Sequence, residues 1–206
     1  MCLERSPGQN TSSYKIMKCI AMSYELYCYR STIGKPDVEE AQLIIEDSSE
    51  FVVNTEVKVK NEIVKALLTH DSRLEVFKLD YEEIARLQKI SIEEARKTFD
   101  YVELNRPEED LARQITVFNE SVTIIVPYWY TGNNAKEVFE QVNEYTKVIG
   151  RVAGMYVYDP QVDRAYDPLV EDFDGLSVYR DVTEQTHQST TNREIHKIAK
   201  PWWKFW

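Results

Sequence analysis

The sequence contains little glycine, little cysteine and no long apolar run. Its 206 residues include 6 Gly and 3 Cys, while 43% are hydrophobic. These counts exclude a collagen-like repeat, a disulfide framework and a wholly disordered chain. The scattered glycines form neither phosphate-binding loop, G-x-x-x-x-G-K-S/T or G-x-G-x-x-G, and no G-x-S-x-G sequence surrounds a nucleophilic serine. The missing motifs argue against an enzyme, although catalytic groups can also converge from distant segments.

Membrane and secretion signals are also missing. Apolar runs such as Val122–Val126 fall far short of the roughly 20 residues that span a bilayer, and residues 1–21 lack the apolar stretch of a signal peptide. The cysteines Cys2, Cys19 and Cys28 fit no C-x-x-C spacing and have no nearby His, so we expect reduced thiols. We therefore predict a cytoplasmic protein without a cofactor, in which residues 1–21 form a leader outside the fold.

The charge of the chain is negative overall and unevenly distributed. The 35 Asp and Glu residues outnumber the 25 Lys and Arg residues, which gives a formal charge of −10. Proteins that bind nucleic acid depend on Lys and Arg to neutralise phosphates, so this composition argues against a nucleic-acid partner. Residues 186–206 carry a net charge of +3, which leaves −13 for residues 1–185. An acidic body of this kind attracts basic proteins.

Hydrophobic periodicity predicts an α+β fold. Apolar residues alternate in the segments expected to be strands and recur every three to four residues in those expected to be helices. The predicted strands are 23–30, 101–104, 112–119, 122–128 and 155–158, and the predicted long helices are 58–69 and 134–150. This order favours a mainly antiparallel sheet with helices packed on one face, in a ferredoxin-like arrangement. We expect one domain over residues 22–185.

Two short helices are predicted within residues 80–99. Asp80 with Glu83, and Ser91 with Glu94, have the spacing of capping boxes, which mark helix starts. The pair has the length of a helix-turn-helix, but acidic residues at the start of the second helix oppose contact with DNA. A helical insertion packed on the core is the preferred interpretation.

Several short motifs resemble those of a known family. They are MSYELYCY at 22–29, RLEVF at 73–77, VPYW at 126–129 and YVYDPQ at 156–161. In these motifs the chain resembles a family of small uncharacterised bacterial cytosolic proteins, over about residues 22–167. The resemblance implies one domain that starts near Met22 and transfers no catalytic residue. Some proteins with a similar opening are suspected immunity proteins of bacterial conflict systems, which implies a toxin as the partner.

Acidic residues recur at every fourth position after the last predicted strand. Asp159, Asp163 and Asp167 could supply oxygen ligands to Ca²⁺ or Mg²⁺, because hard cations prefer several carboxylates. Pro160 and Pro168 disfavour the helix that would align them, so a solvated acidic loop or a short hairpin is the simpler interpretation. A metal site here would make the chain a small metal-dependent hydrolase, which is the alternative function.

The C-terminal segment combines aromatic and basic residues. Its aromatic residues, which we expect to bind a partner, are Trp202, Trp203, Phe205 and Trp206. Residues 186–192 are rich in Thr, Gln, Ser and Asn, as in a flexible tether, so we predict that residues 186–206 are a tail. The tail could dock on the chain's own acidic body, insert into another protein or contact a membrane surface, although its few basic residues would anchor it only weakly to a membrane.

These features together favour a binding protein over an enzyme. The leading expectation is a non-enzymatic protein-binding domain whose acidic surface recognises a basic protein, for example as an immunity protein for a basic toxin. We expect neither a nucleic-acid partner nor stable membrane association. A structural subunit of an oligomer, with tails exchanged between copies, is a third hypothesis.

Overall fold

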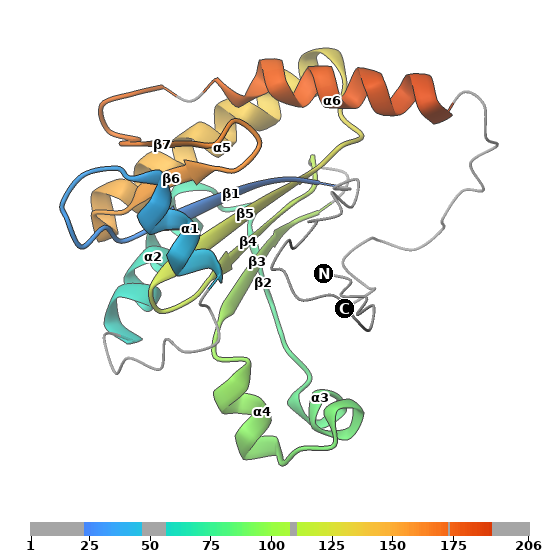
Figure 1. Cartoon of the computed structure of the whole chain (residues 1–206). Helices are drawn as coiled ribbons and strands as arrows, with labels where there is room; N and C mark the ends of the chain where they lie inside the picture. The colour runs from blue at the N-terminus through green and yellow to red at the C-terminus, as the bar shows by residue number, and fades with distance from the viewer. Residues whose placement is uncertain (1–22, 47–56, 108–110, 173, 191–206) are drawn as a thin grey trace, which may run out of the picture.

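The computed structural model describes residues 23–46, 57–107, 111–172 and 174–190. Within these residues the chain forms a seven-stranded sheet in the order β2-β3-β4-β5-β1-β6-β7, and each neighbouring pair is antiparallel (Figure 1). The strands are β1 Ser23–Tyr29, β2 Glu75–Phe77, β3 Val102–Arg106, β4 Arg113–Val117, β5 Ser121–Pro127, β6 Tyr156–Asp159 and β7 Arg164–Tyr166. The helices are α1 Val38–Glu46, α2 Val57–His70, α3 Tyr81–Gln88, α4 Ile92–Thr98, α5 Gly132–Ala153 and α6 Gly175–Thr190.

The predicted α+β class with a mainly antiparallel sheet is confirmed. Four strands and two helices follow one another as β1-α2-β4-β5-α5-β6. In the sheet, β5 lies between β1 and β4, and β1 lies between β5 and β6. This is the split β-α-β arrangement of a ferredoxin-like fold. The segment from β2 to β3, which contains α3 and α4, is inserted between α2 and β4.

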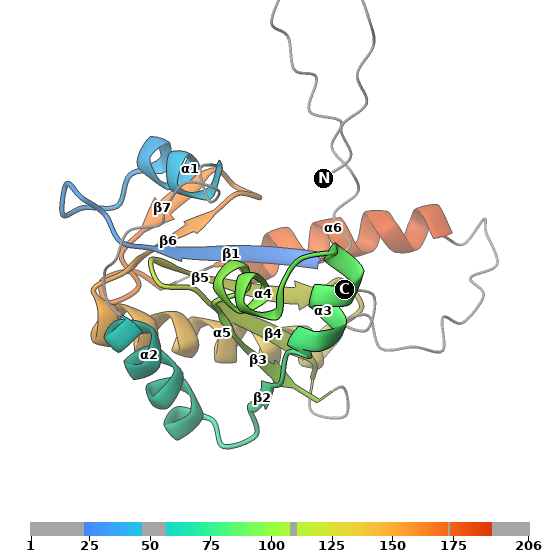
Figure 2. The same ribbon diagram turned by 90° about the horizontal axis from the view of Figure 1, so that it is seen from below.

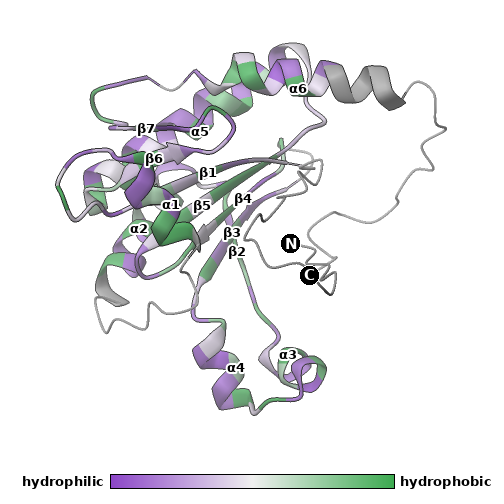
Figure 3. Cartoon of the chain, in the orientation of Figure 1, coloured by the Kyte–Doolittle hydropathy of each residue, from purple (hydrophilic) through white to green (hydrophobic). Residues whose placement is uncertain are grey.

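The main core lies between one face of the sheet and helices α2, α5 and α6. Every second residue of the central strands points into it, because side chains alternate along a strand. Leu26, Leu104, Ile115 and Ile124 are such residues, and all are fully or almost fully buried. The helices supply residues at three-to-four spacing, including Ile63, Leu67, Val138, Val142 and Ile149. The hydropathy colouring in Figure 3 shows β5 as a mainly hydrophobic strand near the middle of the sheet.

Helix α1 packs on the opposite face of the sheet, so the prediction that all helices share one face is wrong for this element. Ala41 lies in a second cluster with Tyr29 of β1 and Tyr158 of β6. The Tyr29 hydroxyl donates to the Asp37 carbonyl at 2.8 Å and accepts from the Asp37 amide at 2.7 Å, which fixes the start of α1. Figure 2 shows α1 at the β6–β7 end of the sheet, away from α2.

Helix α5 continues beyond its predicted end at Gly150. It ends at Ala153, and Gly154 has a φ of 64°, the left-handed conformation of a C-terminal cap. A Cβ atom at Gly150 would lie 2.9 Å from Cγ of Pro168. Gly150 is therefore the place where the loop after β7 crosses the helix closely, rather than the signal that ends it.

The predicted helical insertion is confirmed as α3 and α4. Asp80 accepts hydrogen bonds from two amides of the first turn of α3, and Ser91 accepts one from the Glu94 amide in α4. The two helices pack against each other and project away from the sheet (Figure 1), with only Ala85 and Ala95 buried within them. The expectation that the insertion packs on the core is therefore wrong.

The predicted leader, tether and tail concern the ends of the domain. Helix α6 reaches Thr190, so residues 186–190 of the predicted tether are helical. The Tyr179 hydroxyl joins α6 to the sheet, because it donates to the Pro127 carbonyl at 2.6 Å and accepts from the Tyr130 amide at 3.0 Å. The predicted leader, residues 1–21, and the rest of the predicted tail, residues 191–206, lie outside the described residues.

None of the described helices combines the length and apolarity needed to cross a bilayer.

Candidate functional site

The face of the sheet opposite the main core carries two rows of residues paired across five strands. The first row runs from β1 to β2 through Tyr27, Thr123, Thr116, Glu103 and Phe77. The second row runs through Glu25, Ile125, Gln114, Asn105 and Glu75. We call these ten residues the open face. Helix α1 contacts this face through Tyr27 of β1, whereas helices α2, α5 and α6 supply the main core on the opposite face.

The open face contains three glutamates and no Lys or Arg. Glu25 accepts hydrogen bonds from the hydroxyls of Ser23 and Tyr27, at 3.2 and 2.6 Å. Glu103 accepts one from the side-chain amide of Asn105 at 2.7 Å. All three donors are neutral. Among the described residues, no ion pair involves any of these three glutamates.

Glu103 lies at the centre of the first row and has the least favourable surroundings of the three. In the strand register Glu103 lies between Thr116 and Phe77 of the neighbouring strands, and the residue is only 9% exposed. Burial raises the pKa of this carboxyl, and the hydrogen bond from Asn105 opposes that rise only in part. A cation placed over Glu103 would stabilise the carboxylate, because charges interact more strongly where water is partly excluded.

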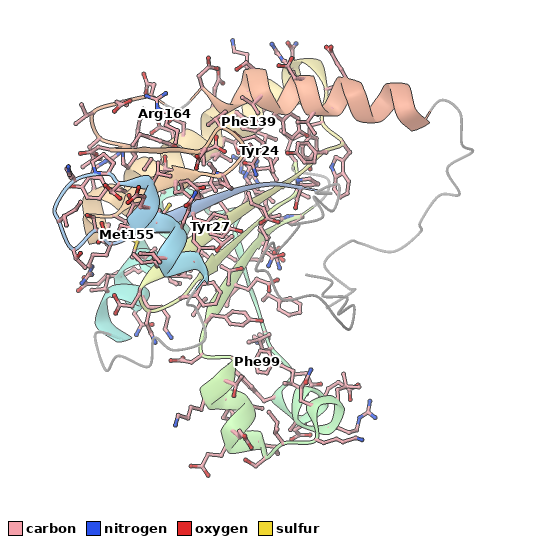
Figure 4. All side chains as sticks on the ribbon, viewed as in Figure 1. Tyr24, Tyr27, Phe99, Phe139, Met155 and Arg164 are labelled. Atoms are coloured by element: carbon pink, nitrogen blue, oxygen red, sulfur yellow. The ribbon has the colours of Figure 1, made fainter. Side chains whose placement is uncertain are left out.

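Aromatic residues border the open face where α4 joins β3. The ring of Tyr101 lies 5.4 Å from that of Phe118 and 6.5 Å from that of Phe99, measured between centroids. Phe118 and Phe77 remain exposed. Tyr27 and Phe99 are labelled in Figure 4 and lie near the α1 end and the α3–α4 end of the molecule. We call Phe99, Tyr101 and Phe118 the aromatic border. The surface thus combines negative charge with flat apolar rings.

A second cluster of charged residues lies on the core side, between α2, β3, β4 and α5. Asp71 accepts hydrogen bonds from Nη1 of Arg106 and from the Tyr145 hydroxyl, each at 2.5 Å. The side-chain oxygen of Gln141 accepts from both Arg106 and Arg113, and both arginines are almost fully buried. Arg73 adds a backbone and a side-chain hydrogen bond to Asp71 at 3.1 Å. The Asp71 cluster joins four elements of the fold.

The electrostatics of the Asp71 cluster are those of a structural network. Burial alone would raise the pKa of Asp71, but its donors Tyr145, Arg73 and Arg106 outweigh burial and hold the pKa at about 2. The carboxylate therefore stays ionised near neutral pH and is a weak base, poorly matched to general base catalysis. A hollow of about 200 Å³ adjoins the cluster, which is smaller than most sites for small molecules.

The three carboxylates proposed as metal ligands take part in separate contacts. Asp159 is buried and accepts hydrogen bonds from the Tyr24 hydroxyl and from the Gln161 amide, the latter at 2.9 Å. Asp163 accepts from Gln42 and Tyr158, both at 3.0 Å. Asp167 accepts from the Leu169 amide at 2.8 Å. These bonds fix the β6–β7 hairpin and the loop after it, which agrees with the predicted short hairpin.

Metal binding therefore finds no support in the described part of the chain. No group of three or more His, Cys, Asp or Glu residues there could hold a metal ion. Asp159 lies beside the rings of the core, because its donor Tyr24 packs edge-on against Phe139 at 5.2 Å (Figure 4). Burial raises the pKa of the Asp159 carboxyl, although hydrogen bonds from Tyr24 and two backbone amides oppose this.

Other residues that could carry chemistry have structural positions or lie outside the described residues. Cys28 is a free, fully buried thiol whose pKa is raised to about 12 by burial, as a packed thiol should be. His70 ends α2, where its ring lies 6.1 Å from that of Tyr145. The predicted partner-binding residues Trp202, Trp203, Phe205 and Trp206 lie outside the described residues.

Sequence patterns did not reveal the open face. Glu25, Glu103 and Glu75 come from three strands far apart in the chain, and only the strand register brings them into two rows. The available signal was the alternation along β1 and β5, which marks one face of these strands as less buried. Comparison with models of protein families, with curated proteins and with solved structures finds no match for this chain.

Proposed function

We propose that this chain is a non-enzymatic, cytoplasmic protein-binding domain whose open face recognises a basic segment of another protein. The proposal rests on the two rows of the open face, which contain three glutamates and no Lys or Arg. None of these glutamates takes part in an ion pair among the described residues. Proteins whose surfaces have complementary charge associate faster and select against wrong partners. The net charge of −10 acts in the same direction.

The size of the open face suits an extended or helical segment of a partner. Five antiparallel strands about 4.8 Å apart place the outer strands roughly 19 Å from each other. Lys or Arg side chains of the partner would lie over Glu25, Glu103 and Glu75, while an aromatic side chain would contact the aromatic border. Aromatic and Arg anchors of this kind contribute most of the binding energy in many interfaces.

The alternative function, a metal-dependent hydrolase, has less support. Two buried carboxylates, Asp71 and Asp159, accept hydrogen bonds that join elements of the fold. The resemblance to suspected immunity proteins gives the binding proposal one concrete form, in which the partner is a basic toxin. Neutralisation of such a toxin would require that the open face cover a basic surface of the toxin.

Affinity capture with a matched pair of variants tests the proposal. The test variant is Glu25→Gln, Glu75→Gln, Glu103→Gln, which removes three charges from the open face but keeps the side-chain shapes. The control variant is Glu82→Gln, Glu93→Gln, Glu94→Gln, which removes three exposed charges from α3 and α4. We expect basic proteins captured by the wild-type chain to be lost from the test variant and kept by the control.

Purified components then decide the result. A captured basic protein is titrated against the wild-type chain and both variants by calorimetry at low and high salt. The proposal predicts at least tenfold weaker binding to the test variant, because several close charge pairs are removed, each worth about 1.5 kcal/mol or more in interfaces. Equal affinity for the wild-type chain and the test variant would refute binding at the open face.

A further inference from the structure

We infer that the open face is also the docking site of this chain's own C-terminal segment, residues 191–206, which thereby competes with the partner. This inference rests on the proposed function, since it adds a means of regulation to the same surface. The first argument is charge. Residues 191–206 contain four basic residues and one glutamate, a net charge of +3, whereas the open face contains three glutamates and no basic residue.

The second argument is the chemistry of the side chains. Three of the 4 Trp residues of the chain lie in residues 202–206, where Lys204 separates them into two groups. Two exposed rings lie near the carboxylates of the open face, because Phe77 belongs to the open face and Phe118 to the aromatic border. An indole contacts such rings in edge-on or offset geometry, while the neighbouring Lys and Arg side chains reach the carboxylates. The segment and the face match in both respects.

The third argument is reach. Tyr179 anchors α6 to Pro127, the last residue of β5 and the second after Ile125 of the open face. Thr190 lies 11 residues after Tyr179, which is about 16 Å along a helix. Residues 191–206 are 16 residues long and span at most about 53 Å when fully extended. This length exceeds the sum of the distance of about 16 Å from Thr190 back to the anchor at β5 and the distance of about 19 Å across the five strands.

Attachment to the same chain favours docking on this chain over docking on a separate molecule. A segment joined to its binding site by a short linker has an effective concentration in the millimolar range. A modest intrinsic affinity is then enough to occupy the open face most of the time. A partner must displace the segment. The apparent affinity of the partner is therefore its intrinsic affinity multiplied by the fraction of chains whose open face is free. The partner's recognition element should therefore resemble residues 191–206 in being basic and aromatic.

Tryptophan fluorescence of the full chain tests the docking directly. Trp129, which is 44% exposed, is changed to Phe so that only Trp202, Trp203 and Trp206 report. We expect a blue-shifted emission and acrylamide quenching about threefold weaker than that of a free synthetic peptide of residues 191–206. Glu25→Gln, Glu75→Gln, Glu103→Gln in the same background should raise quenching toward that of the peptide. The α3–α4 control variant should leave the protection unchanged.

The other possible occupants give different results. Protection that falls on dilution would mean docking on a second copy. Protection that survives the three substitutions on the open face would place the segment elsewhere. Quenching equal to that of the peptide would mean no docking at all, whether or not vesicles containing anionic lipid then protect the indoles. Each of these three results would overturn the inference.

A second variant separates this inference from the proposed function. Lys197→Glu, Lys200→Glu, Lys204→Glu reverses the charge of the segment and leaves the open face intact. We expect it to bind a captured basic partner about tenfold more tightly than the wild-type chain, because the competitor is removed. Equal binding by both chains would refute the competition while leaving the proposed function in place. Protected indoles in the wild-type chain, together with a charge-reversed chain that binds no basic protein, would refute the proposed function while leaving the docking of the segment in place.

Discussion

At the scale of single residues, Asp71 shows how one carboxylate joins several elements of the fold. It receives hydrogen bonds from Arg73 after α2, Arg106 on β3 and Tyr145 on α5. Its pKa in the folded chain is about 2, below the ordinary value of 3.8, because these donors outweigh the effect of burial. This stabilisation is complete above the pKa that Asp71 has in the unfolded chain. It is lost as the pH falls through the pKa that Asp71 has in the folded chain.

The lowered pKa of Asp71 predicts that the chain loses stability over a defined range of acidic pH. Between about pH 4 and pH 2 the wild-type chain should lose about 2 kcal/mol of unfolding free energy from Asp71 alone. Tyr145→Phe removes one donor, so the pKa of Asp71 should rise and the loss should begin at a higher pH. Urea unfolding measured at several pH values checks both statements. An identical pH dependence for the wild-type chain and the variant would contradict this role for Tyr145.

The pair of Tyr24 and Asp159 gives a second prediction at this scale. Asp159 is buried, and Tyr24 is its side-chain donor among the interactions that the structure shows. Tyr24→Phe leaves a buried carboxylate with one donor fewer, so we expect a loss of about 1–3 kcal/mol in unfolding free energy. The loss of unfolding free energy caused by Tyr24→Phe should be smaller in a chain that already carries Asp159→Asn. Thermal unfolding of the two single variants and the double variant measures the coupling, and additive losses would argue against the contact.

At the scale of elements, the packing of α5 against the loop after β7 depends on one glycine. Alanine favours a helix over glycine by up to about 1 kcal/mol, so Gly150→Ala would be stabilising on an isolated helix. Here the added Cβ would lie 2.9 Å from Pro168, and we expect a net loss of about 1 kcal/mol or more from overpacking. Combining it with Pro168→Ala should restore the stability. Chemical denaturation decides the sign, and a stabilised single variant would contradict the close packing.

The elements that sequence periodicity predicted are those whose residues have a single buried face. The stripe of Val138, Val142, Tyr145 and Ile149 specified α5, and the alternation around Asn119 specified the β4–β5 hairpin. The side chosen by α1 was not predictable in this way, because β1 carries large apolar residues on both faces. Its Tyr24 and Leu26 face the main core, whereas Tyr29 faces α1. Helix α6 was missed because its attachment depends on Tyr179 reaching the backbone at Pro127 and Tyr130.

At the scale of the whole molecule, the candidate site depends on strand register. The tail and the acidic excess were visible as composition, because they require no knowledge of contacts. The open face was not visible, because Glu25, Glu75 and Glu103 come to lie on one face of the sheet only through four antiparallel pairings. The same register also separates the open face from the Asp71 cluster on the core side of the sheet. Among the described residues, the sheet therefore carries a charged network on its core side and, on the other side, the acidic surface that we propose as the binding site.

The most direct test of this account is an NMR titration of the ¹⁵N-labelled full chain carrying Lys197→Glu, Lys200→Glu, Lys204→Glu. The titrant is a synthetic peptide of residues 191–206 with the natural sequence, and a peptide with its basic residues changed to Glu is the control. We predict that backbone amide shifts cluster on β1 to β5 at the positions of the open face and at Phe118, and that the control peptide causes none. Shifts confined to α2, α5 and α6, or no shifts with either peptide, would contradict the claim that the open face binds basic aromatic segments.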